Sequence, residues 1–126
     1  MDTLRCPCRK KSETGTYAEC CQPYHAGLPA PTAEALMRLR YSAFVREDVD
    51  YLRATWAPAT RPPHITFIRG RVWLRLQVLA VQTEGDRATV EFIARSRVKG
   101  RSLDLHEVSR FERHAGRWFY IDGVIT

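Results

Sequence analysis

The segment Val72-Trp73-Leu74-Arg75-Leu76-Gln77-Val78-Leu79-Ala80 is where the hydrophobic pattern of this chain changes its period. Alternation with a period of two is typical of a β-strand that buries one face. We therefore predict a strand here, with one face formed by Leu74, Leu76, Val78 and Ala80. This strand separates a helical first half of the chain from a β-rich second half.

Three more strands are predicted after this segment, each preceded by turn residues. The tripeptides Glu84-Gly85-Asp86, Lys99-Gly100-Arg101 and His114-Ala115-Gly116 have the composition of turns between strands. Because these connections are short, neighbouring strands are expected to be antiparallel. The pattern thus predicts a four-stranded meander whose later strands span residues 87–97, 102–113 and 117–122.

The residues before the first strand have the three- and four-residue spacing of an amphipathic helix. Thr32 is the expected N-cap of a long helix, and Asp48 is the expected N-cap of a second helix that continues to Trp56 and ends before Pro58. The apolar stripe of the long helix consists of Leu36, Met37, Tyr41, Phe44 and Val45. Helices followed by a meander predict an α+β fold in which a curved sheet covers the long helix, with one core and room for one cavity.

The composition is that of one globular domain of 126 residues, with 44% hydrophobic and 27% charged residues. This argues against a disordered chain and against a multidomain enzyme. No apolar run approaches the roughly 20 residues that cross a bilayer, and residues 1–8 lack the apolar stretch of a secretion signal. We therefore expect a cytoplasmic protein without a membrane span.

The charge of the chain is unevenly distributed. Twenty Lys and Arg residues against 14 Asp and Glu residues give a formal net charge of +6. Residues 61–101 are rich in arginine and by themselves carry this excess. Because arginine suits two-point contacts to phosphate or carboxylate, direct nucleic-acid contact through residues 61–101 is one interpretation. An ordinary solvated sheet face is the other.

The strongest chemical signal is a group of four cysteines near the N-terminus. Cys6 and Cys8 form one close pair, and Cys20 and Cys21 follow after 11 intervening residues. Thiolates from two close pairs can complete a tetrahedral site, and soft sulfur ligands favour zinc. Because adjacent cysteines strain a single tetrahedral site, His25 is an alternative candidate for the fourth ligand.

Disulfides, free core thiols and redox pairs account less well for the four cysteines. Disulfides are not expected in a reducing compartment, and structural buried cysteines would be scattered among core positions. Thiol redox chemistry or metal handling is an alternative, although redox pairs more often have two residues between the cysteines. A site closed by four protein ligands leaves no position for a substrate, so we expect a folding and docking element and not a catalyst.

Longer stretches of the sequence resemble known families. Cys6-Pro7-Cys8 followed by Cys20-Cys21-Gln22-Pro23-Tyr24-His25-Ala26-Gly27 resembles the SEC-C motif, the small zinc-binding tail of the SecA translocation ATPase. Four further segments are similar to the YchJ-like family of uncharacterised bacterial proteins: Leu36–Phe44, Asp50–Trp56, His106–Phe111 and Gly116–Gly123.

This resemblance implies a chain of two parts. Residues 1–30 would form a SEC-C-like metal-binding motif, and residues 31–126 a domain of the nuclear-transport-factor-2-like (NTF2-like) fold, a cone made by a curved antiparallel sheet around a long helix. By the same resemblance, zinc or iron would be held by Cys6, Cys8, Cys20 and Cys21, with His25 as the alternative ligand. The resemblance implies no activity.

Polar and aromatic residues expected inside the cone are candidates for a pocket. Alternation places Glu107 and Ser109 on a face that is expected to be covered, where a carboxylate must be paired, hydrogen-bonded or functional. Arg38 or Arg40 of the long helix is an expected partner of Glu107, as is Tyr41. A structural ion pair is the alternative role of Glu107. The candidate pocket residues are Tyr41, Trp56, Glu107, Ser109, Tyr120 and Asp122, the last two on one face of the final strand.

Three functional hypotheses are consistent with these patterns. The favoured one is a metal-bound interaction module that docks on a protein or ribonucleoprotein partner, either the ribosome or a component of protein export. The second is a small-molecule-binding or catalytic domain that uses a cone cavity of at least roughly 300 Å³, and the third is thiol redox chemistry or metal handling. Because the spacing shows no acid–base pair, activated nucleophile or phosphate loop, a binding protein is more expected than an enzyme.

Overall fold

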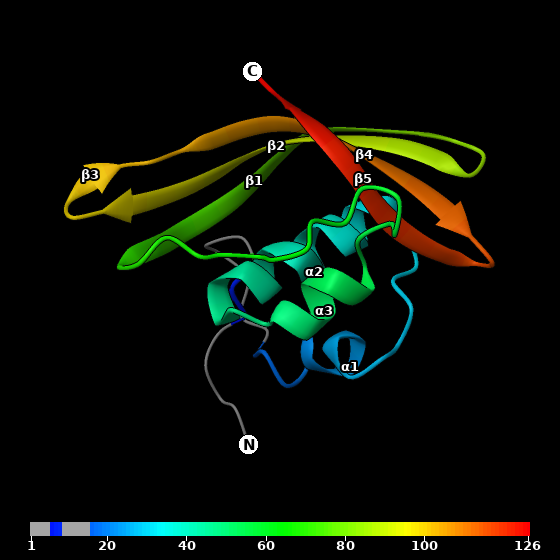
Figure 1. The fold of residues 1–126 in the computed structure, drawn as a ribbon, viewed down its shortest axis with the longest axis horizontal. Coiled ribbons are helices and arrows are strands. Elements are labelled where there is room, and N and C mark those ends of the chain that lie inside the picture. The colour runs from blue at the N-terminus through cyan, green and yellow to red at the C-terminus, as the bar shows by residue number, and fades with distance from the viewer. Residues whose placement is uncertain (1–5, 9–15) are drawn as a thin grey trace.

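A computed structural model describes residues 6–8 and 16–126. Within the segment between the cysteine pairs, residues 9–15 lie outside the described residues. The sheet covers α2 and α3, and α1 lies on the other side of these helices (Figure 1). No helix in the described ranges is long and apolar enough to cross a bilayer. The elements are α1 (Gln22–His25), α2 (Ala33–Arg46), α3 (Val49–Ala54), β1 (Arg71–Glu84), β2 (Arg87–Val98), β3 (Arg101–Ser102), β4 (Leu105–His114) and β5 (Arg117–Ile125).

The two main helices begin at the caps that the sequence predicts. The Thr32 hydroxyl accepts a hydrogen bond from the backbone N–H of Ala35 at 3.0 Å, which satisfies a free donor in the first turn of α2. Glu47 ends α2 in a left-handed conformation with φ of 55°. Asp48 follows at once and caps α3 by accepting from the N–H of Tyr51 at 3.1 Å.

The second helix ends at Ala54, two residues earlier than predicted. The backbone N–H of Tyr120 in β5 donates to the carbonyl of Thr55, and the N–H of Ala57 donates to the carbonyl of Tyr120, both at 2.8 Å. Trp56 therefore pairs with the edge strand β5 in a parallel bridge. Long-range hydrogen bonds replace a further helical turn here, and a local sequence pattern cannot reveal them.

The sheet confirms the predicted antiparallel meander, with the strand order β1-β2-β4-β5. The predicted third strand is divided, because Arg101–Ser102 pairs with β2 as β3 and β4 begins only at Leu105. Between them, the Asp104 carboxylate accepts hydrogen bonds from the backbone N–H of Ser96 at 3.2 Å and from Arg95 at 2.9 Å. A side chain that binds the backbone in this way competes with the strand ladder.

Two bulges change which residues of β1 face the helices. The register with β2 shifts at Leu74 and again at Leu79. The first bulge turns Leu74 outward, where 48% of its surface is exposed, and Trp73 packs against the core instead. The prediction of one face from Leu74 to Ala80 is therefore wrong at both its ends, because each bulge resets the alternation of side chains along a strand.

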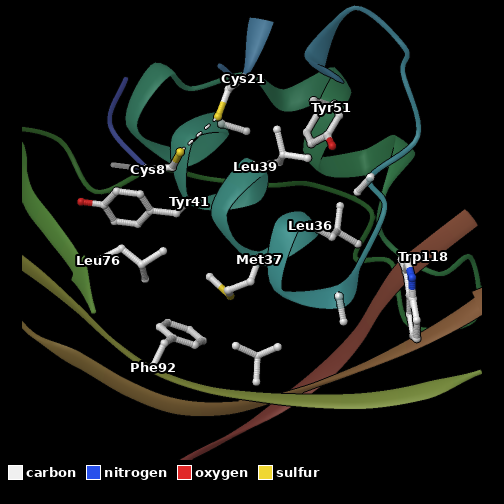
Figure 2. Packing of buried hydrophobic residues seen from close by; sticks show 14 of the residues in the cluster. Cys8, Cys21, Leu36, Met37, Leu39, Tyr41, Tyr51, Leu76, Phe92 and Trp118 are labelled. Atoms are coloured by element: carbon white, nitrogen blue, oxygen red, sulfur yellow. Dashed lines mark hydrogen bonds between the residues drawn. The ribbon is translucent and has the colours of Figure 1, made fainter. Parts of the chain in front are cut away.

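The core lies between α2 and the inner face of the sheet. In Figure 2, Met37 of α2 points toward the sheet, where Phe92 lies on β2. Burying a side chain of this size stabilises the fold by about 1.5–3 kcal/mol. Cys8 and Cys21 lie on the opposite side of α2 from the sheet (Figure 2). The long helix thus separates the cysteine group from the interior of the cone.

Candidate functional site

The four cysteine sulfurs converge although they come from two separate segments. All four Sγ atoms lie within 4.8 Å of one another. The Sγ atom of Cys8 is 3.6 Å from that of Cys6 and 3.5 Å from those of Cys20 and Cys21. The second pair is positioned by α1, because Cys21 is its N-cap and Cys20 belongs to the preceding turn. The cysteines that the sequence singles out therefore form one four-sulfur group.

The spacing of the sulfurs fits a metal ion and not a disulfide. Four sulfurs at roughly 2.3 Å from a zinc ion would lie about 3.8 Å apart at the corners of a tetrahedron. Four of the six distances, those of Cys8 to the other three sulfurs and the 3.9 Å between Cys20 and Cys21, are close to this value. A disulfide needs about 2.05 Å, and all four cysteines are free thiols. The two adjacent cysteines can therefore both serve as ligands of one ion.

Proximity of the thiols also favours a bound cation. Hydrogen bonds with Cys21 and Cys8 lower the pKa of the Cys6 thiol, so one thiolate forms readily. The hydrogen bond with Cys6 in turn raises the pKa of Cys21, and burial adds to this effect. Four sulfurs this close can all be deprotonated when a positive ion offsets their mutual repulsion. Four soft thiolates are the donor set of a structural zinc or iron site.

The cysteine group is closed and is packed against α2. Cys6, Cys8 and Cys21 are all buried. The Sγ atom of Cys6 lies 3.9 Å from the hydroxyl of Ser42, and Arg38 donates a hydrogen bond to the carbonyl of Cys8 at 3.1 Å. An ion bound here would have four protein ligands and no position open to a substrate. Its effect would be to hold the N-terminal segment against the long helix.

His25 does not belong to the four-sulfur group. Its Nδ1 atom lies 2.6 Å from the Tyr17 hydroxyl, and its Nε2 atom lies 2.9 Å from the carbonyl of Leu39 in α2. Because the carbonyl can only accept, Nε2 donates to it, while Nδ1 is hydrogen-bonded to the Tyr17 hydroxyl. The prediction of His25 as an alternative ligand is therefore wrong, since both nitrogens are engaged in joining α1 to α2. Tyr17 was not predicted, because a lone aromatic residue in a polar loop gives no periodic signal.

A second site lies inside the cone, between α2 and the sheet. The cavity has a volume of about 260 Å³, slightly below the roughly 300 Å³ at the lower end for drug-sized ligands. Its wall includes two arginines, Arg40 and Arg71, which the sequence pattern does not assign to a pocket. Five predicted pocket residues line it, namely Tyr41, Trp56, Glu107, Ser109 and Tyr120.

Asp122 lies outside this cavity. The register between β4 and β5 shifts between Arg110 and Phe111, which leaves Ile121 as a bulge. Beyond the bulge, Asp122 lies opposite Arg110 and forms a two-point ion pair with it. The hydrogen bond from Arg110 lowers the pKa of Asp122. The prediction that Asp122 shares a face with Tyr120 is wrong, because the bulge reverses the alternation of the strand.

Arg40 is a charged residue in the buried wall of the cavity, with 3% of its surface exposed. Its Nη1 atom donates to the carbonyl of Leu52 at 2.9 Å and to Oγ1 of Thr55 at 2.8 Å. The guanidinium lies over the rings of Trp56 and Tyr120, 4.9 and 4.6 Å from their centroids. Burial lowers the pKa of Arg40 to about 10, so it stays charged at neutral pH. It forms no ion pair with any carboxylate in the described part of the chain.

Glu107 supplies a carboxylate to the same cavity. Its Oε2 atom accepts hydrogen bonds from the hydroxyls of Ser109 at 2.5 Å and Tyr120 at 3.4 Å. The expected partners on α2 do not bind it; Arg38 pairs with Glu34 instead. The Glu107 side chain passes close to the backbone of Gly123, where a Cβ atom would lie 2.1 Å from Oε2. A glycine within a strand can signal such a close approach.

Two solved structures are similar to this chain, and together with its fold and cysteine group they define its class of protein. A SEC-C motif containing protein from Rhodopseudomonas palustris, solved in solution, is similar with a TM-score of 0.81 and 35% identity, over 91% of this chain and 95% of that chain. The crystal structure of a SEC-C motif containing protein from Psychrobacter arcticus is similar with a TM-score of 0.80 and 30% identity, over 96% and 82%. The class is an α+β protein of NTF2-like fold with an N-terminal cysteine group.

The comparison of sequences then identifies the family. The model of the middle, NTF2-like domain of YchJ matches residues 32–123. A UPF0225 protein of Bordetella pertussis is 50% identical over 125 residues, which cover 95% of this chain and 92% of that protein. One from Xanthomonas campestris is 49% identical over 121 residues, covering 93% and 92%. The chain belongs to the YchJ-like family of UPF0225 proteins, as its resemblance implied.

Proposed function

We propose that this protein is a metal-stabilised interaction module that docks on a ribonucleoprotein through the phosphates of its RNA. The observation that carries the proposal is a pair of like charges on the outer face of the sheet, where Arg75 of β1 lies directly opposite Arg95 of β2. Like charges in directly opposed positions destabilise a sheet. An anionic partner would relieve this repulsion.

More positive charge surrounds this pair. Arg97 is exposed two residues further along β2, and the adjoining turn and β3 are also basic. Asp104 pairs with Arg95 at 2.9 Å. This carboxylate offsets only one of the positive charges, so a surplus of positive charge remains. We call these residues the basic face: Arg75, Arg95, Arg97 and Lys99.

The arrangement of the basic face favours RNA over an acidic protein. Arg95 and Arg97 are two residues apart on one strand, so their Cα atoms are roughly 6.6 Å apart. A row of regularly spaced cations matches the regularly spaced phosphates of a nucleic-acid strand, and the planar fork of arginine binds phosphate at two points. The RNA of the ribosome presents such regularly spaced phosphates. An acidic component of the protein-export machinery is the alternative partner.

The metal centre has a separate, structural part in this proposal. Zinc is the proposed ion, because the donor set is four thiolates at tetrahedral spacing, and iron is the alternative. The cysteine group lies on the opposite side of α2 from the sheet, so it would stabilise the fold without touching RNA. Free thiols fit a cytoplasmic location, where such thiols stay reduced. A redox role has less support, because Cys6, Cys8 and Cys21 are buried.

The test is the salt dependence of binding to a fluorescein-labelled RNA hairpin, measured by anisotropy between about 50 and 200 mM salt. The double variant Arg75→Gln/Arg97→Gln should bind more weakly, with a slope of log K against log salt reduced by about 2, since each lost phosphate contact removes about one. The control is Arg87→Gln, which removes one charge at an exposed arginine at the other end of β2.

Three outcomes contradict the proposal. A loss in Arg87→Gln about half as large as that in the double variant would mean that net charge, and not the basic face, drives binding, because Arg87→Gln removes one charge and the double variant removes two. A parent protein that does not bind the hairpin at low salt would exclude the RNA partner. Binding that does not depend on salt would exclude phosphate contacts. In either of the last two cases, an acidic protein would become the partner to test.

A further inference from the structure

The cone cavity contains polar groups that the fold itself does not use. Within the described residues, Nη1 makes both hydrogen bonds of the Arg40 guanidinium, so Nε and Nη2 have no protein partner. Likewise, Oε2 of Glu107 accepts the bonds from Ser109 and Tyr120, and Oε1 accepts none from the described chain. Donors and an acceptor left over in one cavity are the usual means of orienting a ligand.

The charged side chains that line the cavity indicate which charge the ligand should have. Arg71 is a second guanidinium in the wall; it donates to the hydroxyl of Ser96 at 2.9 Å and stacks on Trp73 at 3.9 Å from the ring centroid. The lining therefore has two guanidinium groups and one carboxylate, Glu107. One positive charge is left over, which favours a ligand with a single negative charge.

The rest of the cavity wall indicates the chemistry of the uncharged part of the ligand. Most of it is apolar, and aromatic rings predominate: Tyr41, Phe44, Trp56, Trp73, Phe92 and Tyr120. Rings of this kind stack on, or pack edge-to-face against, another ring. A cavity of about 150 Å³ holds benzene, so the 260 Å³ of this cavity leave room for a ring with two polar substituents.

The geometry points to a binding site for a small hydroxylated aromatic carboxylate. Its carboxylate would pair with the unused N–H groups of Arg40, its hydroxyl would donate to Oε1 of Glu107, and its ring would pack among the aromatic side chains of the cone. The Arg40 guanidinium is held in place beforehand by Leu52 and Thr55, so little order would be lost on binding. This site is independent of the basic face, which lies on the other side of the sheet.

The experiment compares 4-hydroxybenzoate with its neutral counterpart 4-hydroxybenzamide by titration of the ¹⁵N-labelled protein in NMR spectra. The chain has three tryptophans, and their indole N–H signals report the site directly. Those of Trp56 and Trp73, which line the cavity, should shift. The signal of Trp118, which lines a separate groove beside α3, should not. The carboxylate should bind at least about tenfold more tightly than the amide, because a charge-assisted pair is stronger than a neutral one.

Variants then test the role of each group. Arg40→Gln should remove the preference for the carboxylate, and Glu107→Gln should weaken 4-hydroxybenzoate more than benzoate, which lacks the hydroxyl. Ala94→Leu should abolish binding by filling the cavity while leaving Arg40 in place, so the site can be tested even if Arg40→Gln does not fold. Arg87→Gln, outside the cavity, is the control and should bind as the parent does.

The outcomes that overturn the inference are distinct. Absence of shifts at Trp56 and Trp73 with either compound at millimolar concentration would exclude the site. Equal affinities for the acid and the amide would exclude a charge-selecting role of Arg40. Shifts confined to Trp118 would place the ligand in the other groove. Failure of RNA binding to the basic face would leave this inference untouched, because the two readouts use different residues.

Discussion

Replacing Gly123 by alanine should destabilise the protein through one neighbour, the side chain of Glu107. A Cβ atom at position 123 would lie 2.1 Å from Oε2 and 2.3 Å from Cδ of Glu107, whereas non-bonded atoms pack at roughly 3.5–4.0 Å. The end of the Glu107 side chain must therefore rotate away. In doing so it loses the hydrogen bonds from Ser109 and Tyr120.

The magnitude can be worked out from burial and backbone conformation. Ser109 is 1% exposed, and a buried hydroxyl without a partner costs about 1–3 kcal/mol. The φ angle of Gly123 is not positive, so alanine fits the backbone and by itself would stabilise by about 0.4–1 kcal/mol through the unfolded state. We expect Gly123→Ala to lower the free energy of unfolding by about 1–2 kcal/mol. In a Glu107→Ala background, where the clash is absent, the same change should raise it by about 0.5 kcal/mol.

The assay is a double-mutant cycle by urea unfolding, followed by tryptophan fluorescence at equal metal content. The control is Gly100→Ala, which has a φ of 77° and nothing within 4 Å of the added atom; it should destabilise both backgrounds equally. If the effects of Gly123→Ala in the two backgrounds agree within about 0.5 kcal/mol, the two positions are not coupled and the reasoning is refuted.

Three other changes test separate parts of the structure. Cys8→Ser should lose the bound metal and lower the melting temperature, because Cys8 contacts all three other sulfurs; elemental mass spectrometry that finds one metal per chain in the variant would contradict this. Ala115→Gly should raise the free energy of unfolding by about 0.5–1 kcal/mol, because Ala115 has a φ of 52°; urea unfolding that shows no gain would disprove it. At alkaline pH, the unfolded chain releases tyrosine protons that the fold retains, so the contribution of these tyrosines to stability should be constant below about pH 10 and fall above it. The tyrosines concerned are Tyr41, Tyr51 and Tyr120, whose pKa values burial raises. Ionisation of these tyrosines at their usual pH, seen by ultraviolet titration of the folded protein, would contradict this prediction.

The helices and the meander could be predicted because their signals are local. A hydroxyl at Thr32 or a carboxylate at Asp48 caps a helix through neighbours within three residues. The turn at Lys99-Gly100 adopts positive φ angles at both residues, as tight connections between antiparallel strands do. The same holds for the cysteine group, because close spacing within each pair limits how its sulfurs can be arranged.

The errors have a common physical cause, which is pairing between residues far apart in the chain. The bulges at Leu74 and Ile121 depend on the register with a neighbouring strand, and each reverses the faces that alternation predicts. The early end of α3 depends on hydrogen bonds to Tyr120. His25 has the right spacing for a ligand, but Tyr17 and the α2 backbone engage both its nitrogens. The division into residues 1–30 and 31–126 stays a prediction.

The amino-acid sequence by itself determined the class of fold, the order of its elements and the four cysteines of the sulfur group, because periodicity, caps and close spacing act over a few residues. Only the tertiary structure decided which side chains line the cone cavity and which lie outside it. It set Arg40 over two rings without a carboxylate partner among the described residues, brought Glu107 onto the backbone of Gly123 and moved Asp122 outside. These arrangements depend on strand register and on the curvature of the sheet over α2, which many distant contacts determine together.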